Sequence, residues 1–129
     1  MPFARSPSEL EQTATAQAAS LDALLQASPI GVAVTVERQI REVNDQLCAM
    51  TGYSRADLIG QTTRILHISD EHYQAVGAAL YPQLQLQRVA RMDTEMRCKD
   101  GQIIDVVLCL ALIDPDRPAL GVVSTVIDI

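Results

Sequence analysis

The stretch Asn44–Gln61, NDQLCAMTGYSRADLIGQ, predicts two short helices that need another part of the chain to lie on. Asn44 is suited to begin the first helix because its side-chain oxygen can accept hydrogen bonds from unpaired backbone amides of the first turn. Gly52 is suited to end it, since glycine readily adopts the left-handed conformation that often follows a helix. Ser54 and Asp57 predict a second helix start of the capping-box kind. Helices this short are unstable alone, so the stretch predicts a sheet beside them.

Apolar segments on both sides of this stretch predict that sheet. Five strands are expected, over residues 30–36, 40–43, 91–99, 104–113 and 120–129. Asp100-Gly101 is a strong signal for a hairpin turn between the third and fourth. A longer helix, capped by Ser69, is expected to run to about Leu84 despite Pro82. Strands and helices in this order predict an α+β domain with an antiparallel sheet.

The composition indicates one globular domain of 129 residues, since 48% are hydrophobic and 20% are charged. The net charge of −6 argues against nucleic-acid binding, which needs clustered lysine and arginine. The longest apolar run, Val106–Ile113, is far shorter than a membrane span, so we expect a cytoplasmic module. Cys48, Cys98 and Cys109 lack metal-ligand spacing, and buried free thiols are the simplest interpretation.

The first 27 residues are expected to form an arm and a helix ahead of a domain at residues 28–129. Ser6-Pro7-Ser8-Glu9 is a good helix start, and the sequence that follows it, to about Ala27, contains no helix breaker. An apolar stripe at helical spacing runs along this segment, formed by Leu10, Ala14, Ala18, Leu21 and Leu25. The stripe has two interpretations: the helix packs on its own domain, or it forms a dimer contact.

The central stretch resembles a known family. Its pattern N-x-x-L-x-x-M-T-G-Y-S-x-x-D-L-I-G-Q is similar to the central helical segment of PAS sensor domains. Lys99-Asp100-Gly101 resembles the K-D-G turn of that family, and Val126–Ile129 resembles its D-I-T ending without the threonine. Glu37-Arg38-Gln39 departs from the Asp-Gly turn common there, which leaves the geometry of the first hairpin open. The resemblance covers residues 21–129 and implies the PAS fold, a five-stranded antiparallel sheet with short helices on one face, here with an extra N-terminal helix.

A regulatory role without catalysis follows from this resemblance and from the absence of catalytic motifs. The sequence contains no Gly-rich phosphate loop, nucleophile elbow or HExxH motif, and His67 and His72 lack the spacing of a metal pair on one helix face. The resemblance implies a homodimer and a covalently linked output domain outside this chain. That output domain would be a diguanylate cyclase, a histidine kinase or a transcription regulator, reached through the last strand.

The space between the sheet and the helices is the candidate sensor site. Strand alternation and helix spacing predict inward-facing side chains at Val32, Val34, Met50, Ile65, Tyr73, Val76, Leu80, Met92, Thr94, Met96, Val106, Leu108, Leu110, Val122, Ser124 and Val126. Methionines and small polar residues could leave room for a ligand, whereas the alternative is a plain hydrophobic core. No arginine or lysine is evident among these positions, so we expect an apolar or uncharged ligand. The competing hypothesis is a ligand-free module that serves only to dimerise.

Two cofactors of the family can be weighed against the residues. Flavin photoreceptors of this fold carry G-x-N-C-R-F-L-Q, and residues 60–67, GQTTRILH, match its frame with Thr63 in place of the cysteine. Adduct-forming flavin chemistry needs that thiol and is therefore excluded. Haem-binding relatives use a histidine on the long helix, and His72 is a weak candidate because the ligand position aligns near Gln74. No cofactor is assigned, and haem or redox flavin sensing is the lesser alternative.

Overall fold

The computed structural model describes residue 23 and residues 29–129. The five strands are β1 (Gly31–Val36), β2 (Gln39–Val43), β3 (Val89–Arg97), β4 (Ile103–Leu112) and β5 (Val122–Asp128). The α-helices are α2 (Asp45–Thr51), α3 (Arg55–Leu58) and α4 (Asp70–Gln87), and two 3-10 helices are η1 (Thr63–Leu66) and η2 (Pro118–Leu120). The predicted N-terminal helix, its stripe at Leu10, Ala14, Ala18, Leu21 and Leu25, and the boundary between residues 27 and 28 lie outside the described residues.

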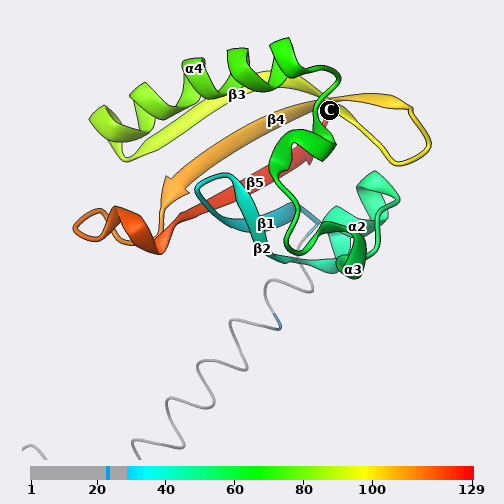
Figure 1. Cartoon of the computed structure of the whole chain (residues 1–129), viewed down its shortest axis with the longest axis horizontal. Coiled ribbons are helices and arrows are strands. Elements are labelled where there is room, and N and C mark those ends of the chain that lie inside the picture. The colour runs from blue at the N-terminus through cyan, green and yellow to red at the C-terminus, as the bar shows by residue number, and fades with distance from the viewer. Residues whose placement is uncertain (1–22, 24–28) are drawn as a thin grey trace, which may run out of the picture.

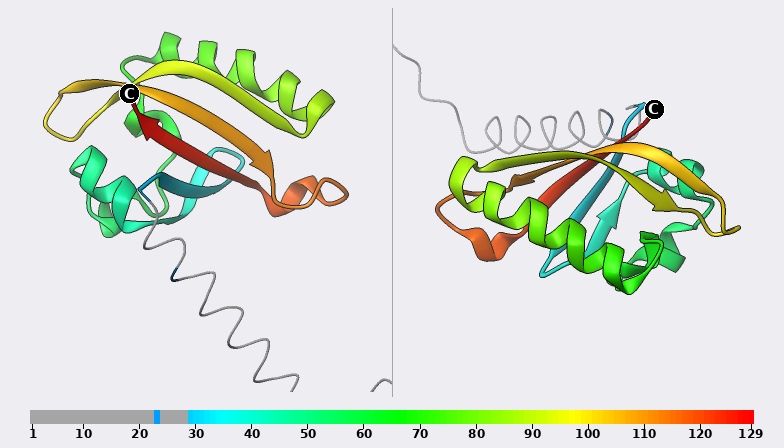
Figure 2. Two further views of the ribbon diagram at one scale, coloured as in Figure 1. Left: turned by 180° about the vertical axis from the view of Figure 1, so that it is seen from behind. Right: turned by 90° about the horizontal axis from the view of Figure 1, so that it is seen from above.

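The strands form one antiparallel sheet in the order β2-β1-β5-β4-β3, so the first and last strands of the domain are neighbours. Figure 1 shows α4 lying along β3, with α2 and α3 near β1 and β2 at the other end of the strand order. The views from behind and from above show the curvature of the sheet and the length of α4 along it (Figure 2). This arrangement confirms the predicted α+β class and the antiparallel sheet.

Asn44 joins the sheet to the first helix. It is buried, and its Oδ1 accepts hydrogen bonds from the backbone N–H of Leu47 at 3.0 Å and of Val32 at 2.9 Å. Its Nδ2 donates to the carbonyl oxygen of Ile30 at 2.9 Å. One side chain therefore caps α2, as the sequence predicts, and also holds the start of β1 beside it.

The second half of the central stretch also folds as predicted. Gly52 follows α2 in the left-handed conformation, with φ 79°. Ser54 and Asp57 form the capping box of α3, each side chain accepting from the backbone N–H of the other. The backbone N–H of Ser54 and the ammonium of Lys99, which lies 3.0 Å from the carboxylate, hold the pKa of Asp57 below its usual value.

Helix α4 is longer than the sequence predicts. It continues past Pro82 to Gln87, and β3 begins at Val89 rather than near residue 91. Proline removes one backbone donor, but burial of Leu84 on the following turn favours continuation of the helix. Arg88 ends it in the left-handed conformation, with φ 66°, and its N–H donates to the carbonyl of Leu84.

The hairpin between β1 and β2 is a two-residue turn built from residues that rarely adopt its geometry. Val36 pairs with Gln39, and the two residues between them, Glu37 and Arg38, have φ of 50° and 64°. Such a turn usually contains glycine or asparagine. Each non-glycine residue held at positive φ costs on the order of 1 kcal/mol. The predicted pairing is correct, and the conformation of the turn sends Arg38 toward the helices.

The core of the domain has two parts. The first joins α2, α3 and η1 to the sheet through Ala33, Ile40, Val43, Leu47, Leu58, Leu66, Met96, Val106 and Val126. The second joins α4 to the sheet through Val76, Leu80, Leu84, Ala90, Leu110 and Val122. Leu108 packs against both. In the described part of the chain, no helix combines the length and apolar character needed to cross a membrane.

Candidate ligand-binding site

A cavity of about 60 Å³ lies between the inner face of the sheet and the helices, near the junction of the two core parts. Strands contribute Ala33, Thr35, Ile40, Thr94, Glu95, Met96, Leu108, Leu110, Ser124 and Val126. Helices and turns contribute Arg38, Leu47, Thr63, Leu66, His67, Val76, Leu80 and Tyr81. A space of this size accommodates a few water molecules or one small organic molecule.

The structure brings many of the predicted residues together around this cavity. Those that line it are Val76, Leu80, Thr94, Met96, Leu108, Leu110, Ser124 and Val126. On β3, β4 and β5, the residues with predicted inward positions do share one face, because Leu110 pairs with Ser124 and Leu108 pairs with both Met92 and Val126.

Val32 and Val34 are placed on the opposite face of the sheet, so their predicted inward position is wrong. Val32 pairs with Thr125, whereas Ala33 pairs with Ser124 and lines the cavity. Side chains alternate along a strand, so an error of one residue exchanges the two faces. Nearly all of β1 is apolar, and its sequence therefore contains no alternation that could identify the inward face.

Six other predicted residues lie near the cavity but do not line it. Val106 belongs to the first part of the core, and Met50 and Ile65 pack against that part. Val122 belongs to the second part of the core, and Met92 packs against that part. Tyr73, the sixth, stacks against Arg38 instead of facing the cavity. These side chains occupy part of the space that was predicted for the ligand, and the cavity is therefore lined by fewer of the predicted residues than expected.

Arg38 is the most informative lining residue that the sequence reasoning missed. Its Nη2 donates to the backbone carbonyl of Tyr73 at 3.0 Å, and its Cζ lies 3.5 Å from the centroid of the Tyr73 ring. A Cβ on Gly77 would lie 2.7 Å from Nη1, so the guanidinium occupies space that glycine leaves open on α4. The expectation that no arginine faces the cavity is therefore wrong. The unusual Glu37-Arg38 turn was the available signal, but only its conformation shows where Arg38 points.

His67, His72 and Thr94 form a hydrogen-bonded row beside the cavity. The Nδ1 atoms of the two histidines are 3.0 Å apart, and His72 Nε2 is 2.9 Å from Thr94 Oγ1. Burial, which has the largest effect, acts together with the neighbouring His72, Arg38 and Arg64 to lower the pKa of His67 to about 4. His67 is therefore neutral at physiological pH and able to accept or donate one hydrogen bond through each ring nitrogen.

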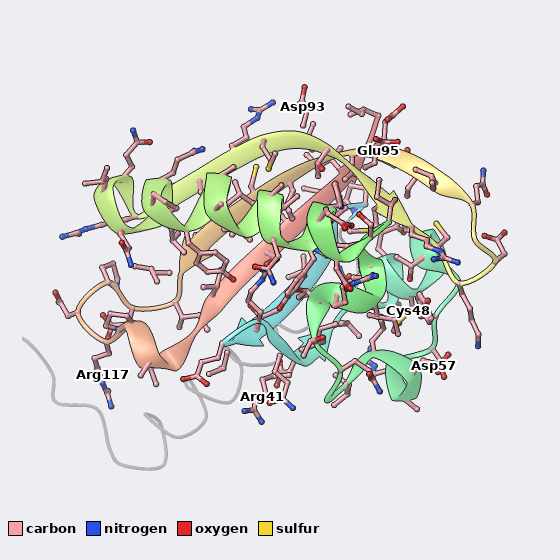
Figure 3. All side chains as sticks on the ribbon, turned by 45° about the horizontal axis from the view of Figure 1, so that its top comes forward. Arg41, Cys48, Asp57, Asp93, Glu95 and Arg117 are labelled. Atoms are coloured by element: carbon pink, nitrogen blue, oxygen red, sulfur yellow. The ribbon has the colours of Figure 1, made fainter. Side chains whose placement is uncertain are left out.

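Two charged residues border the cavity, Arg38 and Glu95. Glu95 borders it, but the pairing of Thr94 with Val106 and of Met96 with Ile104 puts Glu95 on the other face of β3. Figure 3 shows Asp93 and Glu95 on the outer side of the molecule, away from the helices, and both are exposed. Burial raises the pKa of the Tyr81 phenol, so this lining residue stays neutral. The interior thus combines apolar walls, neutral hydroxyl and imidazole groups, and one guanidinium.

Comparisons with known proteins agree with this architecture. A family described as the PAS fold matches residues 19–129. Sensor protein TdiS of Thauera aromatica is 22% identical over 112 residues, which cover 87% of this chain and 20% of that protein. The chain therefore spans about a fifth of the length of this relative.

Solved structures show the same fold. The PAS domain of a LuxR-family transcriptional regulator from Burkholderia thailandensis, in complex with ethanol, is 25% identical with a TM-score of 0.77; the match covers 83% of this chain and 95% of that one. A PAS domain from Colwellia psychrerythraea is 20% identical with a TM-score of 0.79, over 90% of this chain and 97% of that one. Because the match to the PAS family covers residues 19–129, which are most of the chain, this chain belongs to the PAS family.

Proposed function

We propose that this domain is the sensory module of a bacterial signalling protein and binds a small molecule with an apolar body in the cavity described above. The observation that carries the proposal is the cavity itself, whose walls are formed largely by aliphatic side chains such as Leu47, Leu80 and Leu108. Apolar enclosed sites with a few polar groups are typical of small-molecule binding. The related domain with ethanol bound supports a ligand of similar size.

The proposed signal leaves the domain through β5. Ser124 and Val126 line the cavity from this strand, and β5 lies between β1 and β4 in the sheet. A ligand can shift the strand only if it binds two conformations with different affinity. We propose that the receiving output is a histidine kinase, a diguanylate cyclase or a transcription regulator in the same polypeptide, and that the domain acts as a homodimer.

Binding of haem and binding of an adduct-forming flavin are less well supported by the geometry. Haem would need a free imidazole nitrogen, whereas Nδ1 of His72 is 3.0 Å from His67 and Nε2 is 2.9 Å from Thr94. Thr63 borders the cavity at the position where adduct-forming flavin proteins carry cysteine. A ligand-free dimerisation module is the stronger competitor, because the outer face of β4 and β5 carries apolar side chains, Val107 and Ile127 among them.

Filling the cavity provides the test. Ser124→Leu adds bulk inside it, whereas Thr125→Leu adds the same side chain on the other face of β5. We expect 1-butanol to move backbone amide resonances of lining residues in a ¹H–¹⁵N NMR titration of the wild-type chain. Ser124→Leu should weaken this binding at least about tenfold, since steric exclusion of a methylene-sized group already costs over 1 kcal/mol, and Thr125→Leu should retain it.

Two results would count against a ligand-binding role. One is a wild-type spectrum that does not respond to 1-butanol at concentrations that leave the fold intact. The other is equal binding by wild type and Ser124→Leu, which would place the alcohol elsewhere on the surface. Either result would favour the dimerisation module.

A further inference from the structure

The geometry points to a short-chain monocarboxylate as the ligand of this cavity, with its carboxylate bound by the guanidinium of Arg38 and its hydrocarbon part against the aliphatic walls. This inference rests on the proposed function, because it assumes that the cavity holds a ligand. It goes further by assigning the chemical class, and it replaces the expectation of an uncharged molecule. That expectation depended on there being no inward arginine, whereas Arg38 lines the cavity.

Arg38 is held at the cavity by contacts that leave most of its donors available. Its guanidinium stacks over the Tyr73 ring at 3.5 Å and donates one described hydrogen bond, from Nη2 to the Tyr73 carbonyl oxygen. A guanidinium has five N–H donors in a planar fork, which matches the two oxygens of a carboxylate. Stacking on one face fixes the plane of this fork and so reduces the entropy lost when an anion binds.

No carboxylate of the described residues neutralises this cation. The ion pairs found there involve Arg55 with Asp45, Arg64 with Asp70 and Lys99 with Asp57, and none includes Arg38. A half-buried arginine that lines an apolar cavity without an acidic partner is costly to retain. An anionic ligand would supply the missing charge.

The backbone conformation indicates that the position of Arg38 is imposed. Arg38 and its neighbour Glu37 both have positive φ in the β1–β2 turn, where glycine or asparagine would be unstrained. On the opposite side, Gly77 is buried in α4 and leaves the space that Nη1 occupies. The strained β1–β2 turn and the glycine at position 77 of α4 both favour the position of Arg38 at the cavity. Strain of this kind is often associated with binding sites.

The other polar groups at the cavity suit a carboxylate as well. Thr35, Thr63 and Ser124 provide hydroxyl donors, and His67 is a neutral ring that can donate from one nitrogen. Glu95 also borders the cavity, but its side chain lies on the outer face of β3. With a volume of about 60 Å³, the cavity favours an acid with a short hydrocarbon chain over a large aromatic or dicarboxylic one.

A purely structural role is the alternative explanation for Arg38. Its contacts with Tyr73 join the β1–β2 hairpin to α4, and they would do so with or without a ligand. The two roles predict different effects on two probes of matched size. A ligand anchor matters for sodium butyrate and not for 1-butanol, whereas a clamp that maintains the cavity matters equally for both.

The experiment compares sodium butyrate with 1-butanol by NMR titration at pH 7 in the wild-type chain, Arg38→Gln and Arg55→Gln. Arg38→Gln keeps a side-chain donor for Tyr73 but removes the charge, and Arg55→Gln removes an equal charge from an exposed site. We expect Arg38→Gln to weaken butyrate binding about 10- to 100-fold, the usual effect of losing a charge-assisted pair. Its affinity for 1-butanol should stay within about twofold of wild type, and Arg55→Gln should bind both probes as wild type does.

A second variant tests the placement of the guanidinium without removing it. Gly77→Ala puts a methyl group where Nη1 lies, so the fork must move. Butyrate binding should fall by a smaller factor, about 3- to 10-fold, while 1-butanol binding persists. Unchanged butyrate affinity in this variant would contradict the inferred geometry.

The outcomes separate this inference from the proposed function. Binding of 1-butanol but not butyrate, or butyrate binding that survives Arg38→Gln, overturns the carboxylate and leaves the sensory cavity intact. An equal loss of both probes in Arg38→Gln also overturns it, since Arg38 then serves as a clamp. Failure of the wild-type chain to bind either probe overturns both the inference and the proposed function.

Discussion

At the scale of single residues, His67 is a titratable group that the fold keeps neutral. Its side chain is buried beside His72, and the cations Arg38 and Arg64 add to the cost of protonating it. Together these effects lower its pKa to about 4 from an ordinary value of 6.5. The folded domain therefore binds fewer protons than the unfolded chain between these two pH values.

This difference predicts a pH dependence of stability. Because the unfolded state takes up the proton first, stability should be complete above about pH 6.5 and should fall as the pH is lowered toward 4. Between pH 7 and pH 5 the contribution of His67 is on the order of 2 kcal/mol. Urea unfolding of wild type and His67→Gln at both values would measure it. The variant should lose less stability than wild type on acidification; an equal loss would mean that His67 is not the group responsible.

At the scale of elements, the junction between η2 and β5 lies very close to β1. Gly121 has φ 107°, and a Cβ there would lie 2.3 Å from the carbonyl oxygen of Thr35 and 2.9 Å from Cγ2 of Val36. The obstacle is mainly backbone of the neighbouring strand, which has little freedom to move. Gly121 thus permits the close approach of β5 to the end of β1, beside the cavity-lining Thr35.

Two glycine substitutions should separate steric exclusion from backbone strain. Gly60 also has positive φ, 88°, but no heavy atom lies within 4 Å of the Cβ position. Gly60→Ala should therefore cost only the strain of a left-handed alanine, about 1–2 kcal/mol. Gly121→Ala should cost more, about 3 kcal/mol or above, because it adds a clash with β1. Equal losses in the free energy of unfolding by urea would refute the close approach of these strands.

At the scale of the whole molecule, the sheet has one face covered by helices and another with apolar positions. Val107, Cys109 and Ala111 of β4 lie on the outer face, beside Ile127, Thr125 and Val123 of β5. Exposed apolar side chains such as Ile127, at 40%, are typical of a protein–protein contact, whereas Val107 is already buried in the single chain. The sequence adds the N-terminal stripe, and together they support the proposal that the chain is a homodimer.

Charged substitutions in the stripe test this proposal. Leu21→Glu with Leu25→Glu would put two carboxylates into an apolar contact, which is unfavourable unless they are paired. We expect the double variant to sediment as a monomer in analytical ultracentrifugation at concentrations where wild type is a dimer. Leu86→Glu serves as a matched control because Leu86 is 85% exposed on α4 and should not change the assembly. A dimer that persists in the double variant would exclude the N-terminal helix as the interface.

Much of the fold could be predicted because its signals are local. Asn44 caps α2 three residues ahead of Leu47, and Ser54 and Asp57 cap α3 over the same separation. Interactions of this range depend on residue types at fixed spacing and can be read without knowing the rest of the structure. The end of α4 was less predictable, because the left-handed residue that follows it is Arg88 and not the glycine or asparagine that usually signals a helix end.

The sequence by itself thus determined the order of helices and strands, their caps and the family, through contacts between residues a few positions apart. The tertiary structure alone decided which face of β1 lines the cavity and that Arg38 enters it. It also brought His72 to Thr94, 22 positions away, and Arg38 to Tyr73, 35 positions away. These features depend on strand register and on side chains that meet only after the chain has folded, and no local pattern encodes them.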